Sequence, residues 1–157
     1  MPAKVFFTRE LTPEKVVELY RALGVELPGK VAVKVHSGEK GNQNFLRPEF
    51  WRPMVEAVQG TIVECNTAYG DATGGVRDNT ESHLKLIEEH GWNEYFPVDL
   101  LDAQGPDVVW PIPHGKILKE NHLGKNILHY DSMLVLAHFK GHPMGGYGGA
   151  LKQLSIG

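Results

Sequence analysis

Three short apolar runs rich in β-branched residues place the strongest constraint on how this chain can fold. They span residues 30–35, 61–65 and 132–137, and segments with helical periodicity lie between the first two and beyond the second. β-Branched side chains pack well on a pleated surface, so each run predicts a buried strand. Strands that alternate with helices favour a mainly parallel or mixed sheet. We therefore expect a three-layer α/β fold with helices on both faces of the sheet.

Helix start and stop signals support this pattern. Thr12 is a suitable N-cap, Pro13 suits a first turn, and Gly24 is a typical helix stop. The other expected elements are a helix over residues 50–58 ended by Gly60, a helix over residues 80–90 ended by Gly91, a strand at residues 4–8, an irregular sheet extension over residues 95–119 and a helix over residues 123–128.

Size and charge limit the class of protein. A chain of 157 residues with 41% hydrophobic residues fits one domain, here residues 1–157. The net charge of −3, with lysines and glutamates interspersed, predicts no affinity for nucleic acid or for an anionic membrane. The N-terminus lacks the apolar stretch of a signal peptide, and no segment has membrane-spanning length, so we expect a cytoplasmic protein.

Polar residues directly follow the predicted strands. His36, Asn66 and His138 each come just after a strand end. Ligands of parallel α/β sheets bind beyond the carboxyl ends of the strands, which meet at one edge. We therefore expect a ligand site at this edge, with the side chains of His36 and His138 within about one ligand's width of each other.

Two histidines near the C-terminus have metal-ligand spacing. His138 and His142 are four positions apart, a spacing that can bring two imidazoles to one metal ion. The alternative is that both rings only hydrogen-bond to their loop.

The glycines that follow predict an anion site. Gly146, Gly148 and Gly149 leave backbone N–H groups unshielded, and Lys152 adds a positive charge soon afterwards. A phosphate or carboxylate could bind there. The alternative is a tight corner with a solvated lysine.

Two further segments contain residues that could take part in catalysis. His36 opens a loop dense in His, Glu, Lys, Asn and Arg, which could carry out proton transfer or orient an oxyanion, or could be an ordinary polar surface loop. Cys65 is the single cysteine, so the chain can form no internal disulfide and cannot supply four cysteines to a cluster. It could be a nucleophile, although free cysteines are most often packing residues.

Several of these segments together resemble a known family. Residues 34–42, 47–48, 66–69, 138–142 and 148–152 are similar, in the same order, to a family of uncharacterised bacterial and archaeal iron–sulfur-centre proteins. The resemblance implies [4Fe–4S] clusters held by a C-terminal ferredoxin-like segment that this chain lacks. It further implies that the chain is the N-terminal ligand- or substrate-binding domain of an iron–sulfur redox protein, with a redox partner.

A shorter stretch resembles the nickel-pincer lactate racemases. Residues 142–152 are similar to a segment of those enzymes in which a histidine acts in catalysis and a lysine holds the cofactor covalently. The resemblance implies that His142 is the acid/base and Lys152 the anchor. A metal- or cofactor-dependent enzyme using His36, His138 and His142 is therefore one alternative function, and a non-catalytic binding or scaffold module is another.

Overall fold

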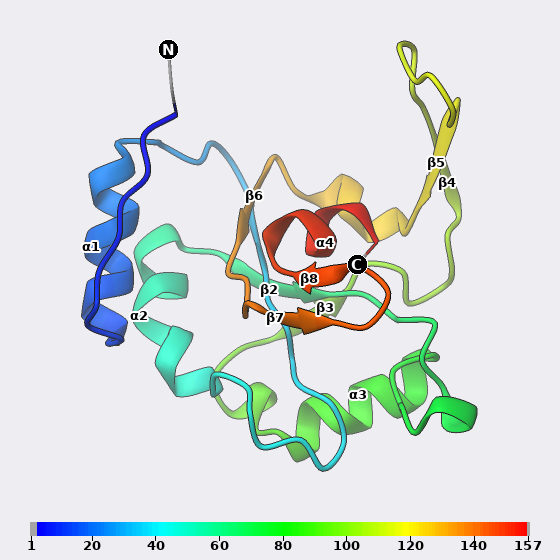
Figure 1. Ribbon diagram of the computed structural model, residues 1–157, viewed down its shortest axis with the longest axis horizontal. Helices are drawn as coiled ribbons and strands as arrows, with labels where there is room; N and C mark the ends of the chain where they lie inside the picture. The colour runs from blue at the N-terminus through cyan, green and yellow to red at the C-terminus, as the bar shows by residue number, and fades with distance from the viewer. Residues whose placement is uncertain (1–2, 157) are drawn as a thin grey trace.

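A parallel sheet forms the centre of the protein (Figure 1). The computed structural model describes residues 3–156. Its four-stranded sheet has the order β3-β2-β1-β6, and all neighbouring strands run parallel. The strands are β1 (Val31–Lys34), β2 (Thr61–Glu64), β3 (Val98–Leu100) and β6 (Ser132–Val135). The three strands predicted from the apolar runs are confirmed.

Three helices form where caps and periodicity predicted them. They are α1 (Pro13–Leu23), α2 (Pro48–Val58) and α3 (Thr80–Glu89). The Thr12 side chain accepts a hydrogen bond from the Lys15 N–H, and Gly24 ends α1 with a left-handed φ of 63°. The end of α2 differs from the prediction, because Gln59 rather than Gly60 adopts the left-handed conformation, with φ of 50°.

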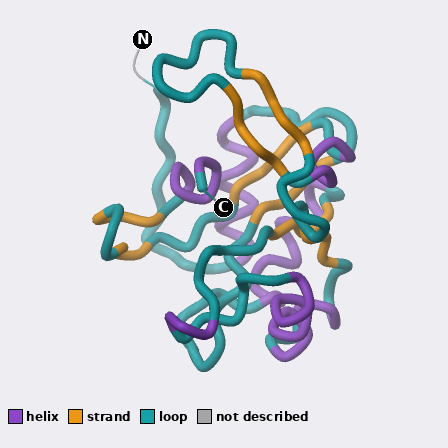
Figure 2. Tube along the Cα trace, turned by 90° about the vertical axis from the view of Figure 1, so that its right-hand side faces the viewer, coloured by secondary structure: helices purple, strands orange, loops and turns teal. Residues whose placement is uncertain are grey.

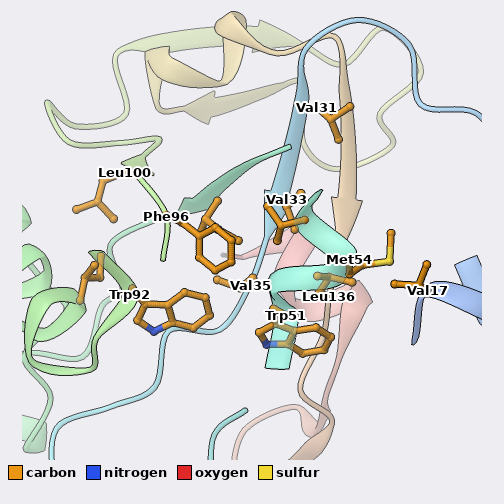
Figure 3. Packing of buried hydrophobic residues seen from close by; sticks show 13 residues of the cluster. Val17, Val31, Val33, Val35, Trp51, Met54, Trp92, Phe96, Leu100 and Leu136 are labelled. Carbon is orange, nitrogen blue, oxygen red and sulfur yellow. The ribbon is translucent and has the colours of Figure 1, made fainter. Parts of the chain in front are cut away.

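The first face of the sheet carries the main core (Figure 3). Val31, Val33 and Val35 alternate along the β1 segment and pack with Trp51 and Met54 of α2. Val17 of α1 and Ile87 of α3 belong to the same buried cluster. The three helices therefore cover one face.

The second face has a smaller core. Ala32 and Val63 pack there against Ile127 and Tyr130 near the 3₁₀ helix η3 (Lys125–His129). The short helix α4 (Ala150–Ser155) lies in front of the sheet and contacts β6 (Figure 1). Helices on both faces make the predicted three-layer α/β fold correct.

Three of the predicted elements need correction. Residues 4–8 form no strand; they run as irregular chain beside α1, with Val5 87% and Phe7 82% exposed, because no strand pairs with them. The predicted helix over residues 123–128 is the 3₁₀ helix η3, preceded by a strand. Residues 95–119 do extend the sheet through β3, but β4 (Val108–Pro111) leaves it and pairs with β5 (Glu120–Leu123) in a projecting hairpin (Figure 2).

A second hairpin leads to the end of the described chain. It consists of β7 (Lys140–His142) and β8 (Gly146–Gly148), which pair antiparallel immediately before α4. The glycine-rich turn therefore leads into a helix as expected, but that helix has only 6 residues. Over residues 3–156, no helix has the length and apolar character needed to cross a membrane.

Candidate functional site

A cleft of about 740 Å³ lies at the carboxyl ends of β1 and β2. The ends of the two strands contribute one side, and the β7–β8 hairpin with α4 contributes the other. Parallel strands direct their carboxyl ends to the same edge, where α/β sheets usually bind ligands. The side chains that give the cleft its chemical character are Lys34, His36, Glu64, Cys65, Tyr69, Arg77, Lys140, His142, Met144, Lys152, Gln153 and Ile156.

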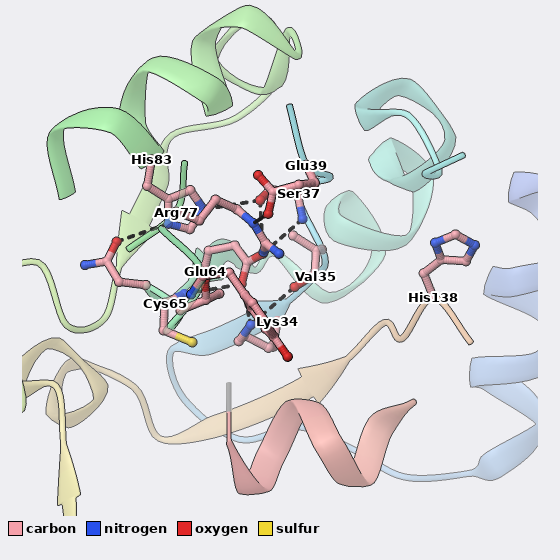
Figure 4. Close-up of polar contacts among 12 residues, drawn as sticks. Lys34, Val35, Ser37, Glu39, Glu64, Cys65, Arg77, His83 and His138 are labelled. Atoms are coloured by element: carbon pink, nitrogen blue, oxygen red, sulfur yellow. Dashed lines mark hydrogen bonds and ion pairs between the residues drawn. The ribbon is translucent and has the colours of Figure 1, made fainter. Parts of the chain in front are cut away.

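An ion pair between Lys34 and Glu64 lies at the strand ends (Figure 4). Both side chains are almost fully buried, at 4% and 3% exposed. Lys34 Nζ donates to a carboxylate oxygen of Glu64 and also to the carbonyl oxygen of Val35, 3.3 Å away. Burial favours the neutral form of Glu64, but the positive charges of Lys34 and Arg77 outweigh it and hold the pKa of Glu64 at about 2. The carboxylate is therefore ionised.

Further hydrogen bonds fix the Glu64 carboxylate. Its Oε1 accepts from the backbone N–H of Ser37 at 2.9 Å and from the Ser37 hydroxyl at 3.0 Å. Arg77 lies 3.7 Å from the same oxygen and donates through Nε to Glu39 at 3.0 Å. These contacts join the loops that follow β1 and β2, because Ser37 and Glu39 lie on the first loop and Arg77 on the second.

Positive charge dominates the cleft although the chain carries a net charge of −3. Lys34, Arg77, Lys140 and Lys152 line it, and Glu64 is the one carboxylate among the described residues that line it. Burial and the neighbouring charges of Arg77 and Lys152 lower the pKa of Lys140. Within residues 3–156, neither Lys140 nor Lys152 forms an ion pair. The cleft can therefore attract an anion.

His36 and His138 come together at the point where the strand order reverses, between β1 and β6. Their ring centroids are 6.3 Å apart, which confirms the expected proximity. His36 lines the cleft, and burial together with Arg77 and Lys140 lowers its pKa to about 3, so the ring is neutral. His138 does not belong to the cleft lining and lies apart from the Glu64 cluster in Figure 4, with its Nδ1 buried and unpartnered among the described residues.

The ring of His142 is oriented by its own hairpin. Its Nδ1 accepts hydrogen bonds from the N–H groups of Met144 at 3.3 Å and Gly145 at 3.0 Å. In the neutral ring the proton therefore lies on Nε2, which is 3.5 Å from the Tyr69 hydroxyl. Tyr69 lies on the loop after β2 and His142 at the end of β7, so this contact links two segments that line the cleft.

The structure adds no third ligand to the metal site predicted at His138 and His142, among the described residues. Among the described residues, no group of three or more His, Cys, Asp or Glu side chains could hold a metal ion. The positive charges that lower the pKa of His36 also oppose binding of a bare dication. A metal ion bound by His138 and His142 stays a prediction.

The predicted anion-binding residues separate into two groups. Gly148, Gly149 and Lys152 line the cleft. Gly146 lies outside the lining, and its φ of 66° allows the tight turn between β7 and β8.

Cys65 also lines the cleft, but as a protonated thiol. Burial raises the pKa of Cys65 to about 11, so little thiolate forms near neutral pH. One cysteine does not fit a [4Fe–4S] cluster, which requires four ligands.

Several residues of the cleft were not predicted as site residues from the sequence. They are Lys34, Glu64, Arg77, Lys140 and Gln153. A signal was present for two of them, since Lys34 and Glu64 are charged residues inside runs that otherwise indicate buried strands. A charged side chain in such a run needs a partner, because burial of a lone charge is costly.

Comparisons with known proteins place the chain in a family without assigning an activity. The family model described as "Domain of unknown function (DUF362)" matches residues 31–157. No curated protein and no solved structure matches the chain.

Proposed function

The chain belongs to the DUF362 family, a domain of unknown function, and we propose from its cleft that the domain binds a small organic anion. One observation supports this proposal above the others. Lys140 and Lys152, which form no ion pair within residues 3–156, line a cleft whose one lining carboxylate among the described residues is already paired with Lys34 and Arg77.

The charges in the free protein repel one another. Arg77 and Lys152 both lower the pKa of Lys140, which means that their charges disfavour its ammonium form. A bound carboxylate or phosphate would relieve this repulsion and accept hydrogen bonds from the same groups.

Calorimetric titration at low ionic strength tests the proposal. Sulfate, phosphate and small carboxylates should bind to the wild-type domain, and Lys152→Ala should weaken binding by about 1–3 kcal/mol, the range for hydrogen bonds to charged groups. Lys85→Ala is the matched control, because Lys85 is an exposed lysine of α3 outside the cleft. Equal binding by Lys152→Ala and wild type would reject the role of Lys152, and absence of any binding would reject the function.

The wider proposal is that this domain is the ligand- or substrate-binding part of an iron–sulfur redox protein. It rests on the family resemblance of residues 34–42 and 138–152, together with a cleft large enough for an organic substrate. Because the residues of this chain do not fit a cluster, any electron transfer would need a redox partner outside the described residues.

A cofactor-dependent enzyme is a second candidate, favoured by one specific observation. His142 and Lys152 line the same cleft, as the similarity to the nickel-pincer enzymes requires. Such a cofactor would supply redox or hydride chemistry, while His142 would present its Nε2–H to the substrate. Elemental analysis and intact-mass measurement of the purified protein test this candidate, because a covalently held cofactor adds mass that Lys152→Ala should remove.

A scaffold module is the third candidate. It predicts no saturable binding of any anion in the calorimetric titration, and no metal or added mass in the purified protein.

A further inference from the structure

The side chain of Gln153 has an unmet hydrogen-bonding capacity at the cleft. Gln153 lies on α4 and lines the cleft, yet both its amide oxygen and its amide nitrogen are buried without a hydrogen-bond partner in the described structure. Buried polar side-chain atoms nearly always have a partner, and leaving one unpaired is unfavourable. Here an acceptor and a donor of one side chain are unpaired together.

The cleft is also much larger than an inorganic anion. A volume of about 740 Å³ falls within the range of sites for cofactor-sized organic molecules. Apolar side chains complete the lining beside the cations, and two of them are largely exposed to the cleft and solvent, Met144 at 82% and Ile156 at 76%. These surfaces suit an uncharged body attached to the anionic group.

We propose that the ligand is an organic anion with an amide-type edge, an N–H beside a C=O, and that the Gln153 side chain turns towards the cleft and recognises this edge through both ends of its amide. This inference rests on the proposed anion-binding function and adds the chemical class of the ligand. A group that both donates and accepts gives the amide oxygen and the amide nitrogen of Gln153 one partner each, whereas an apolar body would leave both atoms unpaired.

Two matched acids serve as probes. Hippurate and 4-phenylbutyrate have the same phenyl and carboxylate ends and the same number of atoms between them, but only hippurate has an amide. Two neutral hydrogen bonds should make wild type bind hippurate at least about fivefold more tightly than 4-phenylbutyrate. Gln153→Met, which keeps the length and helix propensity of the side chain, should abolish this preference.

The same variant has a second readout in the free protein. Because Met has no polar group to leave unpaired, Gln153→Met should raise the midpoint of thermal unfolding by about 2–6 °C without ligand. If Gln153 serves in ligand recognition, its amide should lower the stability of the free protein and strengthen ligand binding. A purely structural glutamine would not combine these two effects. Gln104→Met is the control, since Gln104 is exposed and outside the cleft, and it should change neither quantity.

The outcomes separate this inference from the proposed function. If sulfate and both acids bind but hippurate is not preferred, or if Gln153→Met keeps the preference, the inference is wrong and anion binding stands. A lower unfolding midpoint for Gln153→Met also overturns it, because the amide would then already have a partner. If neither sulfate nor either acid binds, the proposed function itself fails.

Discussion

Lys34 and Glu64 form a buried ion pair at the adjacent ends of two parallel strands, with the ammonium of Lys34 donating to the carboxylate of Glu64. The pair lies in the cleft lining, where Arg77 also contacts the Glu64 carboxylate, so Lys140 and Lys152 remain without an ion-pair partner among the described residues. The electrostatic character of the cleft thus depends on this pair.

Breaking the Lys34–Glu64 pair should destabilise the fold strongly. Either Lys34→Met or Glu64→Gln should lower the free energy of unfolding by about 3–5 kcal/mol, because each leaves a buried partner uncompensated. The double variant should cost less than the sum of the two single variants. Urea-induced unfolding measures the free energy of unfolding of the two single variants and of the double variant, with Arg52→Ala as the control. Arg52 pairs with Glu56 on an exposed surface, and its loss should cost at most about 1 kcal/mol. Additive costs for Lys34 and Glu64 would contradict a direct coupling.

Stability should fall with acidification in two stages. Burial lowers the pKa of His83 from about 6.5 to about 4, and burial with the nearby cations lowers that of His36 to about 3. The unfolded chain therefore binds these protons first, and stability is lost as pH falls below about 6.5. The pKa of Glu64 is lowered from about 4.5 to about 2, so its contribution is lost as pH falls from 4.5 towards 2. A tenfold difference in proton affinity between the folded and unfolded states corresponds to about 1.4 kcal/mol of stability.

The variant His83→Gln measures the share of His83 in the first stage, while the share of His36 remains. The unfolding free energy measured between pH 4 and pH 6.5 should depend less steeply on pH than in wild type, while the drop below pH 4.5 persists. The exposed His114→Gln serves as the control. An unchanged slope in His83→Gln would exclude a buried neutral imidazole at this position.

Cys65 should react slowly with alkylating reagents. Because burial raises its pKa to about 11, the thiolate fraction near neutral pH is small, and iodoacetamide should modify the folded protein at least about tenfold more slowly than the protein in denaturant. Mass spectrometry over time measures the rate. Since Cys65 lines the cleft, saturating hippurate should slow the reaction further. Rapid labelling of the folded protein would show an accessible thiolate instead.

Gly75→Ala should distort one wall of the cleft. A Cβ at Gly75 would lie 2.3 Å from the carbonyl oxygen of Tyr69, so the backbone must shift and the Tyr69 contact with His142 should be lost. We expect a cost of about 1–3 kcal/mol in unfolding free energy and weaker anion binding. Gly141→Ala is the control, because a Cβ there meets nothing within 4 Å. Equal anion affinity in the two variants would show that this wall does not contribute to binding.

The elements that could be predicted from the sequence are those specified by nearby residues. Thr12 and Gly24 bound α1 because capping acts within one turn, and β1, β2 and β6 follow from runs of β-branched residues. The strand predicted at residues 4–8 was wrong for a complementary reason, since a strand requires a neighbour to pair with, and local composition cannot supply one.

The candidate site was only partly predictable. The sequence indicated the correct edge of the sheet and several residues that line the cleft, including His36, His142 and Lys152, because strand ends and glycine-rich turns are local features. It did not indicate Gln153, whose position on a short helix has no local signal of function.

The amino-acid sequence by itself determined the α/β class, most of the strand and helix bounds, and the edge at which strand-end residues gather. Only the tertiary structure decided which charges meet. Lys34 pairs with Glu64, which is 30 positions away in the sequence, and Arg77 pairs with Glu39 at a separation of 38 positions. The reason is physical. Helix caps and side-chain periodicity act between residues a few positions apart, whereas burial and electrostatic pairing depend on distances in space that exist only after the sheet has assembled.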